Sequence, residues 1–107
     1  MSIKQRSDKL LDERVAYIKK AGGLCGACSF HVTPIGTPYI KWLLSCEQTQ
    51  DEFHIYNNKV EYWYLDHGGG ITRCLEPNLA QLVKDVGMRK FISDVGETQN
   101  ILSFRIN

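Results

Sequence analysis

The chain has 107 residues, of which 43% are hydrophobic and 23% charged, as expected for one globular domain over residues 1–107. Its formal net charge of +1 argues against a broad surface for nucleic acid or for an anionic membrane. No apolar run approaches the roughly 20 residues of a membrane span. The polar N-terminal residues 1–6 lack the apolar core of a signal peptide, so we expect a cytoplasmic protein with reduced thiols.

The first element that the sequence predicts is a helix over residues 7–20. Its apolar residues recur three or four positions apart, which places them on one face of a helix. Ser7 is the expected N-cap, and Gly22 with Gly23 is expected to end the helix.

Strands are predicted next, because the apolar period changes from that of a helix to an alternation. Four segments show this alternation or a short apolar run: 29–33, 39–46, 52–56 and 60–65. Asn57-Asn58 is typical of a hairpin turn, and the glycine-rich residues 66–70 are expected to form a flexible turn.

A second helix is predicted over 76–86, ended by Gly87, and a short strand over Ile101–Ile106. The order of elements indicates an α+β fold with a central antiparallel β-sheet flanked by two helices, and we expect one helix on either face.

The four cysteines offer a C-x-x-C pair, Cys25 and Cys28, with Cys46 and Cys74 apart from it. A strong zinc signal would have a second close-spaced pair, and a redox pair would follow a strand and open a helix. We therefore expect free thiols, no metal and no cofactor, with zinc and redox chemistry as alternatives.

The central strand and the second helix carry sequence patterns of a known family. Residues 26–33 (GACSFHVT) are similar to the strand motif G-x-[F/Y]-[L/V]-[I/V]-R-x-S, and residues 79–83 match its L-x-x-L-V helix. The chain resembles an SH2 domain over residues 8–106. The SH2-like domains of Janus kinases are the most similar in pattern, through three further segments: 19–22 (KKAG), 53–55 (FHI) and 101–105 (ILSFR).

The resemblance implies a sheet between two helices and a pocket for phosphotyrosine. In the family, an arginine on this strand donates two hydrogen bonds to the phosphate, and His31 takes that position in this chain. Thr33 keeps the hydroxyl of the family's serine, and His54 stands near a basic position on the third strand. The candidate phosphotyrosine-binding residues are therefore His31, Thr33 and His54, with one imidazole donor in place of the guanidinium fork.

These residues lead us to expect an SH2-like peptide- or protein-binding module with weakened, altered or lost phosphotyrosine recognition. Its expected partner is a tyrosine-phosphorylated or extended peptide or protein. The alternative is a small intracellular interaction protein of the inhibitor or immunity type, which binds a protein without phosphotyrosine. An enzyme is not expected, because strand alternation places Cys28 and His31 on opposite faces and the spacing implies no orienting carboxylate.

Overall fold

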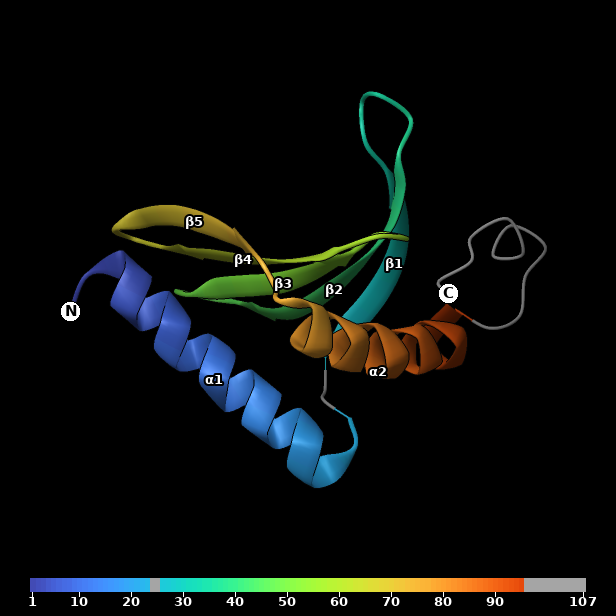
Figure 1. Cartoon of the computed structure of the whole chain (residues 1–107). Coiled ribbons are helices and arrows are strands. Elements are labelled where there is room, and N and C mark those ends of the chain that lie inside the picture. Colours follow the sequence, from blue (N-terminus) through green and yellow to red (C-terminus); the bar gives the residue numbers. More distant parts are fainter. Residues whose placement is uncertain (24–25, 96–107) are drawn as a thin grey trace.

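The structure is a computed structural model that describes residues 1–23 and 26–95 (Figure 1). It consists of α1 (Ile3–Ala21), β1 (Ala27–Val32), β2 (Pro38–Cys46), β3 (Gln50–Ile55), β4 (Val60–Asp66), β5 (Gly69–Cys74) and α2 (Pro77–Val95). The strands form one five-stranded sheet in the order β1-β2-β3-β4-β5, with every neighbouring pair antiparallel. The predicted α+β class, an antiparallel sheet with two flanking helices, is confirmed. The predicted strand Ile101–Ile106 lies outside the described residues.

Both helices pack on the same face of the sheet, where α1 and α2 also contact each other (Figure 1). Trp42, Phe53 and Tyr62 lie in register across β2, β3 and β4 and are fully or almost fully buried beneath the helices. The expectation of one helix on either face is therefore wrong. Most of the large apolar side chains lie on one face of the strands, so both helices cover that face.

The first helix begins earlier than predicted. Ser2 is its N-cap: the Ser2 hydroxyl accepts a hydrogen bond from Gln5 N, and the Gln5 side chain accepts one from Ser2 N. Ser7, the predicted N-cap, lies buried inside the helix and donates to Lys4 O at 2.9 Å. The predicted end is confirmed, since Gly22 closes the helix with a positive φ of 72°.

The second helix does not end at Gly87 but continues to Val95. Gly87 is buried, and a Cβ atom built there would lie 2.5 Å from Ile55 Cδ1 and 3.1 Å from Trp42 Cε3. Glycine therefore lets α2 approach the sheet closely, and it does not act here as a helix stop.

The strand β5 occupies part of the segment predicted as a flexible turn and was not expected. Gly69 and Gly70 open this strand and pair with Asp66 and Leu65 of β4. A strand that starts with two glycines lacks the apolar alternation by which strands are recognised in sequence.

The buried charge of the fold is centred on Asp51, whose carboxylate is fully buried at the start of β3. Arg14 of α1 binds it with two hydrogen bonds of 2.9 Å, and Ser45 and Tyr62 donate to the same carboxylate. Burial, followed by the charge of Asp51, raises the pKa of Tyr62. Such a fully hydrogen-bonded pair fixes the position of α1 on the sheet. Asp51 precedes the predicted strand 52–56, in a polar segment expected to form a turn, whereas β3 begins at Gln50.

Among the described residues, no helix combines the length and the apolar character needed to cross a bilayer.

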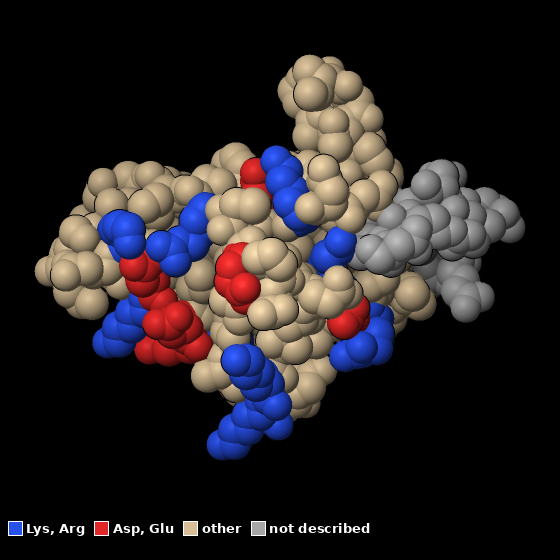
Figure 2. Space-filling model, in the orientation of Figure 1, with Lys and Arg blue, Asp and Glu red and all other residues tan. Residues whose placement is uncertain are grey.

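On the face of the molecule drawn in Figure 2, Lys and Arg side chains lie beside Asp and Glu side chains. Local ion pairs of the protein include Lys4 with Asp8 at 3.0 Å and Lys90 with Asp94 at 3.3 Å.

Candidate functional site

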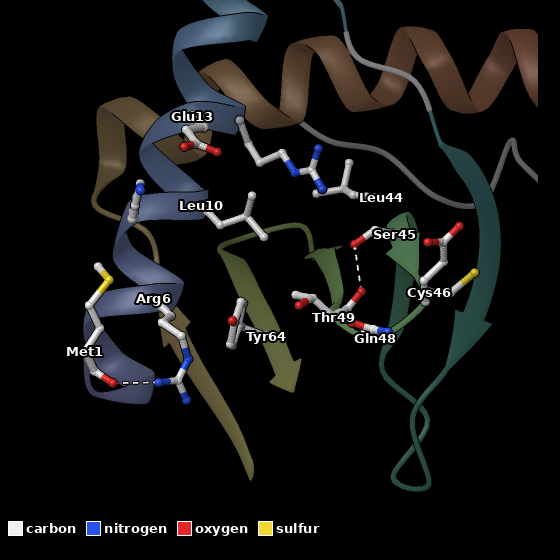
Figure 3. A pocket seen from close by; sticks show the side chains of 13 residues that line it. Met1, Arg6, Leu10, Glu13, Leu44, Ser45, Cys46, Gln48, Thr49 and Tyr64 are labelled. Atoms are coloured by element: carbon white, nitrogen blue, oxygen red, sulfur yellow. Dashed lines mark hydrogen bonds between the residues drawn. The ribbon is translucent and has the colours of Figure 1, made fainter. Parts of the chain in front are cut away.

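A groove of about 910 Å³ runs between the N-terminal half of α1 and the β2–β3 turn (Figure 3). Arg6, Leu10 and Glu13 line it from α1, and Ser45 and Thr49 line it from the hairpin. The Ser45 hydroxyl lies 3.1 Å from Thr49 O and within hydrogen-bond distance of the buried carboxylate described above, and these two acceptors share its one proton.

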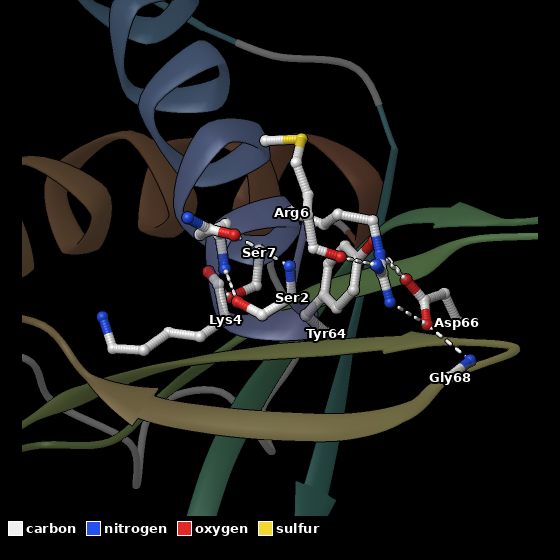
Figure 4. A network of polar contacts seen from close by, with 9 residues as sticks. Ser2, Lys4, Arg6, Ser7, Tyr64, Asp66 and Gly68 are labelled. Carbon is white, nitrogen blue, oxygen red and sulfur yellow. Dashed lines mark hydrogen bonds and ion pairs between the residues drawn. The ribbon is translucent and has the colours of Figure 1, made fainter.

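Arg6 closes one end of this groove and ties α1 to the β4–β5 hairpin (Figure 4). Its guanidinium donates to both carboxylate oxygens of Asp66, at 2.8 and 3.4 Å, and to Met1 O. Tyr64 O–H and Gly68 N donate to the same carboxylate at 2.7 Å. The Arg6 hydrogen bond, followed by that of Tyr64, holds the pKa of Asp66 well below its usual value. Because Arg6, Arg14 and Ser45 of this groove are already bonded to carboxylates of the sheet, we assign these residues a structural role.

The sheet face turned away from both helices, called here the open face, carries a different set of side chains. It is formed by the alternate strand residues Ser29, His31, Tyr39, Lys41, Glu52, His54, Glu61, Trp63, Leu65, Gly70 and Thr72. Two large hydrophobic residues on it remain accessible, Trp63 with 41% and Leu65 with 50% of their surface exposed. Exposed apolar groups that gather on one face mark a binding surface.

Four rings stand side by side across this face, from β1 to β4. The aromatic row consists of His31, Tyr39, His54 and Trp63, and neighbouring centroids lie 5.5, 4.8 and 4.5 Å apart with interplanar angles of 25°, 23° and 18°. Tyr56 also stacks on Tyr39 at 5.2 Å. Stacked rings restrict one another, so the row presents a pre-formed surface.

The aromatic row lies next to the carboxylate of Glu52 on β3. Glu52 is nearly buried, with His54 Nε2 donating to one of its oxygens and Gln50 Nε2 donating to the other at 3.0 Å. Lys41 Nζ lies 3.9 Å from the same carboxylate. Burial acts to raise the pKa of Glu52, but the hydrogen bonds from His54 and Gln50 and the charge of Lys41 outweigh it, so the pKa is lowered. The open face therefore holds an ionised carboxylate at neutral pH.

The three predicted site residues are only partly brought together. His31 and His54 both lie on the open face, on the two sides of the Tyr39 ring. Thr33 follows β1, and its hydroxyl accepts a hydrogen bond from Thr37 N at 3.0 Å within the β1–β2 turn. A hydrogen bond of 2.7 Å joins Ser29 Oγ and His31 Nε2. Cys28 lies on the opposite face from His31, with its thiol 3.9 Å from Gly87 O.

Sequence reasoning missed Tyr39, Glu52 and Trp63 as members of this surface. The alternation of side chains along β2 and β4 was the signal that could have placed Tyr39 and Trp63 on the face opposite Trp42 and Tyr62. What was lacking was the pairing of the strands, which sets Glu52 of β3 directly opposite Trp63 of β4.

A cleft of about 350 Å³ opens beside Trp63 at the β5 side of the open face. Its lining includes Gln50, Glu52, Leu65, Gly70 and Thr72. His54 stacks on one face of the indole, and the cleft is lined by Trp63 together with Gly70 and Thr72 of β5.

The described cysteines are free thiols, and two of them, Cys28 and Cys74, lie far apart. Cys28 is buried on β1, and Cys74 is exposed at the end of β5. These strands are opposite edges of the five-stranded sheet, so about four strand spacings of 4.8 Å separate them. A single zinc ion cannot be bound by both. Cys25 lies outside the described residues.

Comparison of the chain with family models, with curated proteins and with solved structures gave no match.

Proposed function

We propose that this chain is a protein-binding module that contacts its partner through the open face of the sheet and does not require phosphotyrosine. The aromatic row carries the proposal: it ends at Trp63, which lies with Leu65, a second large exposed hydrophobic residue, on a face that neither helix covers. Tryptophan is enriched among residues that dominate binding energy, and rigid side chains lose little entropy when a partner binds.

The surroundings of the two histidines argue against phosphate as the ligand. The Glu52 carboxylate is hydrogen-bonded to His54, so a phosphate dianion approaching this imidazole would meet a like charge. His31 is already hydrogen-bonded to Ser29, and the Thr33 hydroxyl already accepts from Thr37 N. The sequence predicts weakened, altered or lost phosphotyrosine recognition, and the proposal corresponds to the loss.

The resemblance to SH2 domains stays a prediction. It implies a sheet between two helices, whereas α1 and α2 lie together on one face. The proposed use of the open face does not depend on membership of that family, and it fits the alternative of an interaction protein that binds without phosphotyrosine equally well.

Selection from a random displayed peptide library tests the proposal. Peptides that bind the wild-type chain are expected to lose about tenfold or more in affinity for the double variant Trp63→Ser, Leu65→Ser. The matched control is Gln48→Ser, at an exposed residue of the groove, which should bind within about twofold of wild type. Equal affinity for the double variant and the control would refute the use of the open face.

The role of phosphate is tested on tyrosine-containing peptides from the same selection, made with and without the phosphoryl group. We expect the two forms to bind within about twofold of each other. The proposal would be refuted if the phosphorylated form bound the wild-type chain tenfold more tightly than the unphosphorylated form and bound the His31→Arg variant more tightly still. The open face would then be a phosphotyrosine-binding surface.

A further inference from the structure

The edge strand β5 offers a partner both backbone groups and space. β5 is the last strand of the sheet, and within residues 1–23 and 26–95 no other strand pairs with its outer edge. Such an edge presents unpaired N–H and C=O groups, to which an extended segment of another protein can add as a further strand. On the open face β5 carries Gly70, which has no side chain, and Thr72, which has a short one.

These small residues leave a path from the edge to the indole of Trp63. Thr72 lies directly opposite Trp63, and Gly70 directly opposite Leu65. An added strand would lie about two strand spacings, or 10 Å, from β4. A long side chain of that strand can lie across Thr72, beside the Leu65 side chain that lies over Gly70, and reach the indole face that His54 leaves uncovered.

The charge of the cleft favours a cation. Among the described residues that line it, Glu52 is the charged one, and Lys and Arg are absent. Lys41, the lysine beside Glu52, comes from β2, on the far side of Glu52 from the cleft. The two hydrogen bonds to Glu52 that come from His54 and Gln50 use one lone pair on each oxygen, and a carboxylate has about four acceptor sites.

We propose that the cleft beside Trp63 binds an arginine side chain, which an extended segment of the partner protein presents by adding as a strand to the edge of β5. This inference rests on the proposed function. The guanidinium plane stacks on the indole, and its N–H groups donate to the Glu52 carboxylate. Arginine suits this site better than lysine, because its planar group can stack and donate at the same time.

The test uses peptides selected from the random displayed library on the wild-type chain. We expect arginine to be enriched at one position, within residues that alternate as in a strand. The leading peptide is then made with arginine or with citrulline at that position, because citrulline keeps the shape and loses the charge. Citrulline should weaken binding about tenfold or more, the loss expected for a charge-assisted hydrogen bond.

Glu52→Gln should weaken binding of the arginine peptide by the same factor and leave the citrulline peptide within about twofold, which is the signature of a direct pair. Since Glu52 also holds His54, Gly70→Val provides a second variant that leaves the carboxylate in place. A valine side chain at this position projects into the path across β5, and its Cβ meets Leu65 Cδ1 at 3.3 Å. It should reduce binding of the arginine peptide about tenfold, and the arginine peptide should shift the backbone amide NMR signals of residues 69–74.

The outcomes separate this inference from the proposed function. Peptides that show no preference for arginine over citrulline, yet lose affinity for Trp63→Ser, Leu65→Ser, would refute the arginine site and keep the open face as the binding surface. Peptides that bind this double variant as well as wild type would refute both. Amide shifts on β1 in place of β5 would refute strand addition at this edge.

Discussion

The indole of Trp63 lies nearly parallel to the imidazole of His54, with 4.5 Å between the ring centroids and 18° between the planes. The same imidazole donates from Nε2 to Glu52. His54 therefore links the exposed end of the aromatic row to the buried carboxylate, and both groups of the proposed arginine site are positioned by one residue. A surface held in this way needs little rearrangement when it binds.

Replacing His54 with alanine should destabilise the fold by about 1–3 kcal/mol, because it removes a charge-assisted hydrogen bond to a nearly buried carboxylate and one stacking partner. His31→Ala is the matched control at the other end of the row. The His31 side chain bonds to Ser29 on an exposed part of the strand, so its loss should cost less than about 1 kcal/mol. Urea midpoints of the two variants measure the difference, and equal midpoints would contradict this role of His54.

Gly87→Ala should destabilise the protein although alanine is the better helix former. The new methyl group would overlap Ile55 Cδ1 and crowd Trp42, both fully buried. Overpacking costs about 1–3 kcal/mol and exceeds the helix-propensity gain of up to about 1 kcal/mol. Gly23→Ala, where a Cβ meets no atom within 4 Å, is the control and should be neutral. The midpoint of thermal unfolding measures the stability of each variant. A Gly87→Ala variant as stable as wild type would mean that α2 does not pack this closely.

The ion pair between Arg6 and Asp66 predicts a pH dependence of stability. The pKa of Asp66 is lowered in the folded protein, while in the unfolded chain it is about 3.9. Its contribution to the free energy of unfolding is therefore complete above about pH 5 and is lost as the pH falls below 4. Asp66→Asn should be less stable than wild type at pH 7, and the gap should shrink at pH 3. A gap in urea midpoint that stays constant between these pH values would contradict the assignment.

The cysteines should differ in reactivity. Burial, followed by the charge of Asp94, raises the pKa of Cys28 to about 12, so its thiol stays protonated at pH 8. Cys46 and Cys74 are exposed. Iodoacetamide at pH 8 should alkylate both of these in the folded protein and reach Cys28 only after unfolding. Peptide mass mapping of protein alkylated with and without urea shows which cysteines have reacted. Rapid labelling of Cys28 in the native protein would disprove its burial.

Much of the fold follows from local sequence patterns. The helical period located both helices, Gly22 marked the end of α1, and alternation located the first four strands. Three features depend on tertiary contacts and escaped prediction. From the sequence alone Gly87 predicts the end of a helix, because its close contacts with Trp42 and Ile55 are tertiary. The strand β5 has glycines where strands usually have apolar residues. The placement of both helices on one face of the sheet is decided by packing.

Less of the candidate site could be predicted. Alternation alone places His31 on one face of its strand, and it leaves open which residues of β3 and β4 lie nearby. The pairing of Glu52 with His54 and the stack of His54 on Trp63 depend on strand register, which no short motif encodes. Thr33 was predicted from a motif position, and the hairpin turn uses its hydroxyl instead.

The simple order of the sheet has a consequence for how the chain reaches this structure. Each strand pairs with the one next to it in sequence, so the whole meander forms through short-range contacts. The helices are different: the Arg6–Asp66 pair spans 60 positions, and the bond from Cys28 N to Asp94 spans 66. Because closing such long loops costs more entropy, the hairpins should form first and the two helices should dock afterwards, a sequence of events that pulse-labelled hydrogen exchange would reveal as early protection of β2–β4 amides.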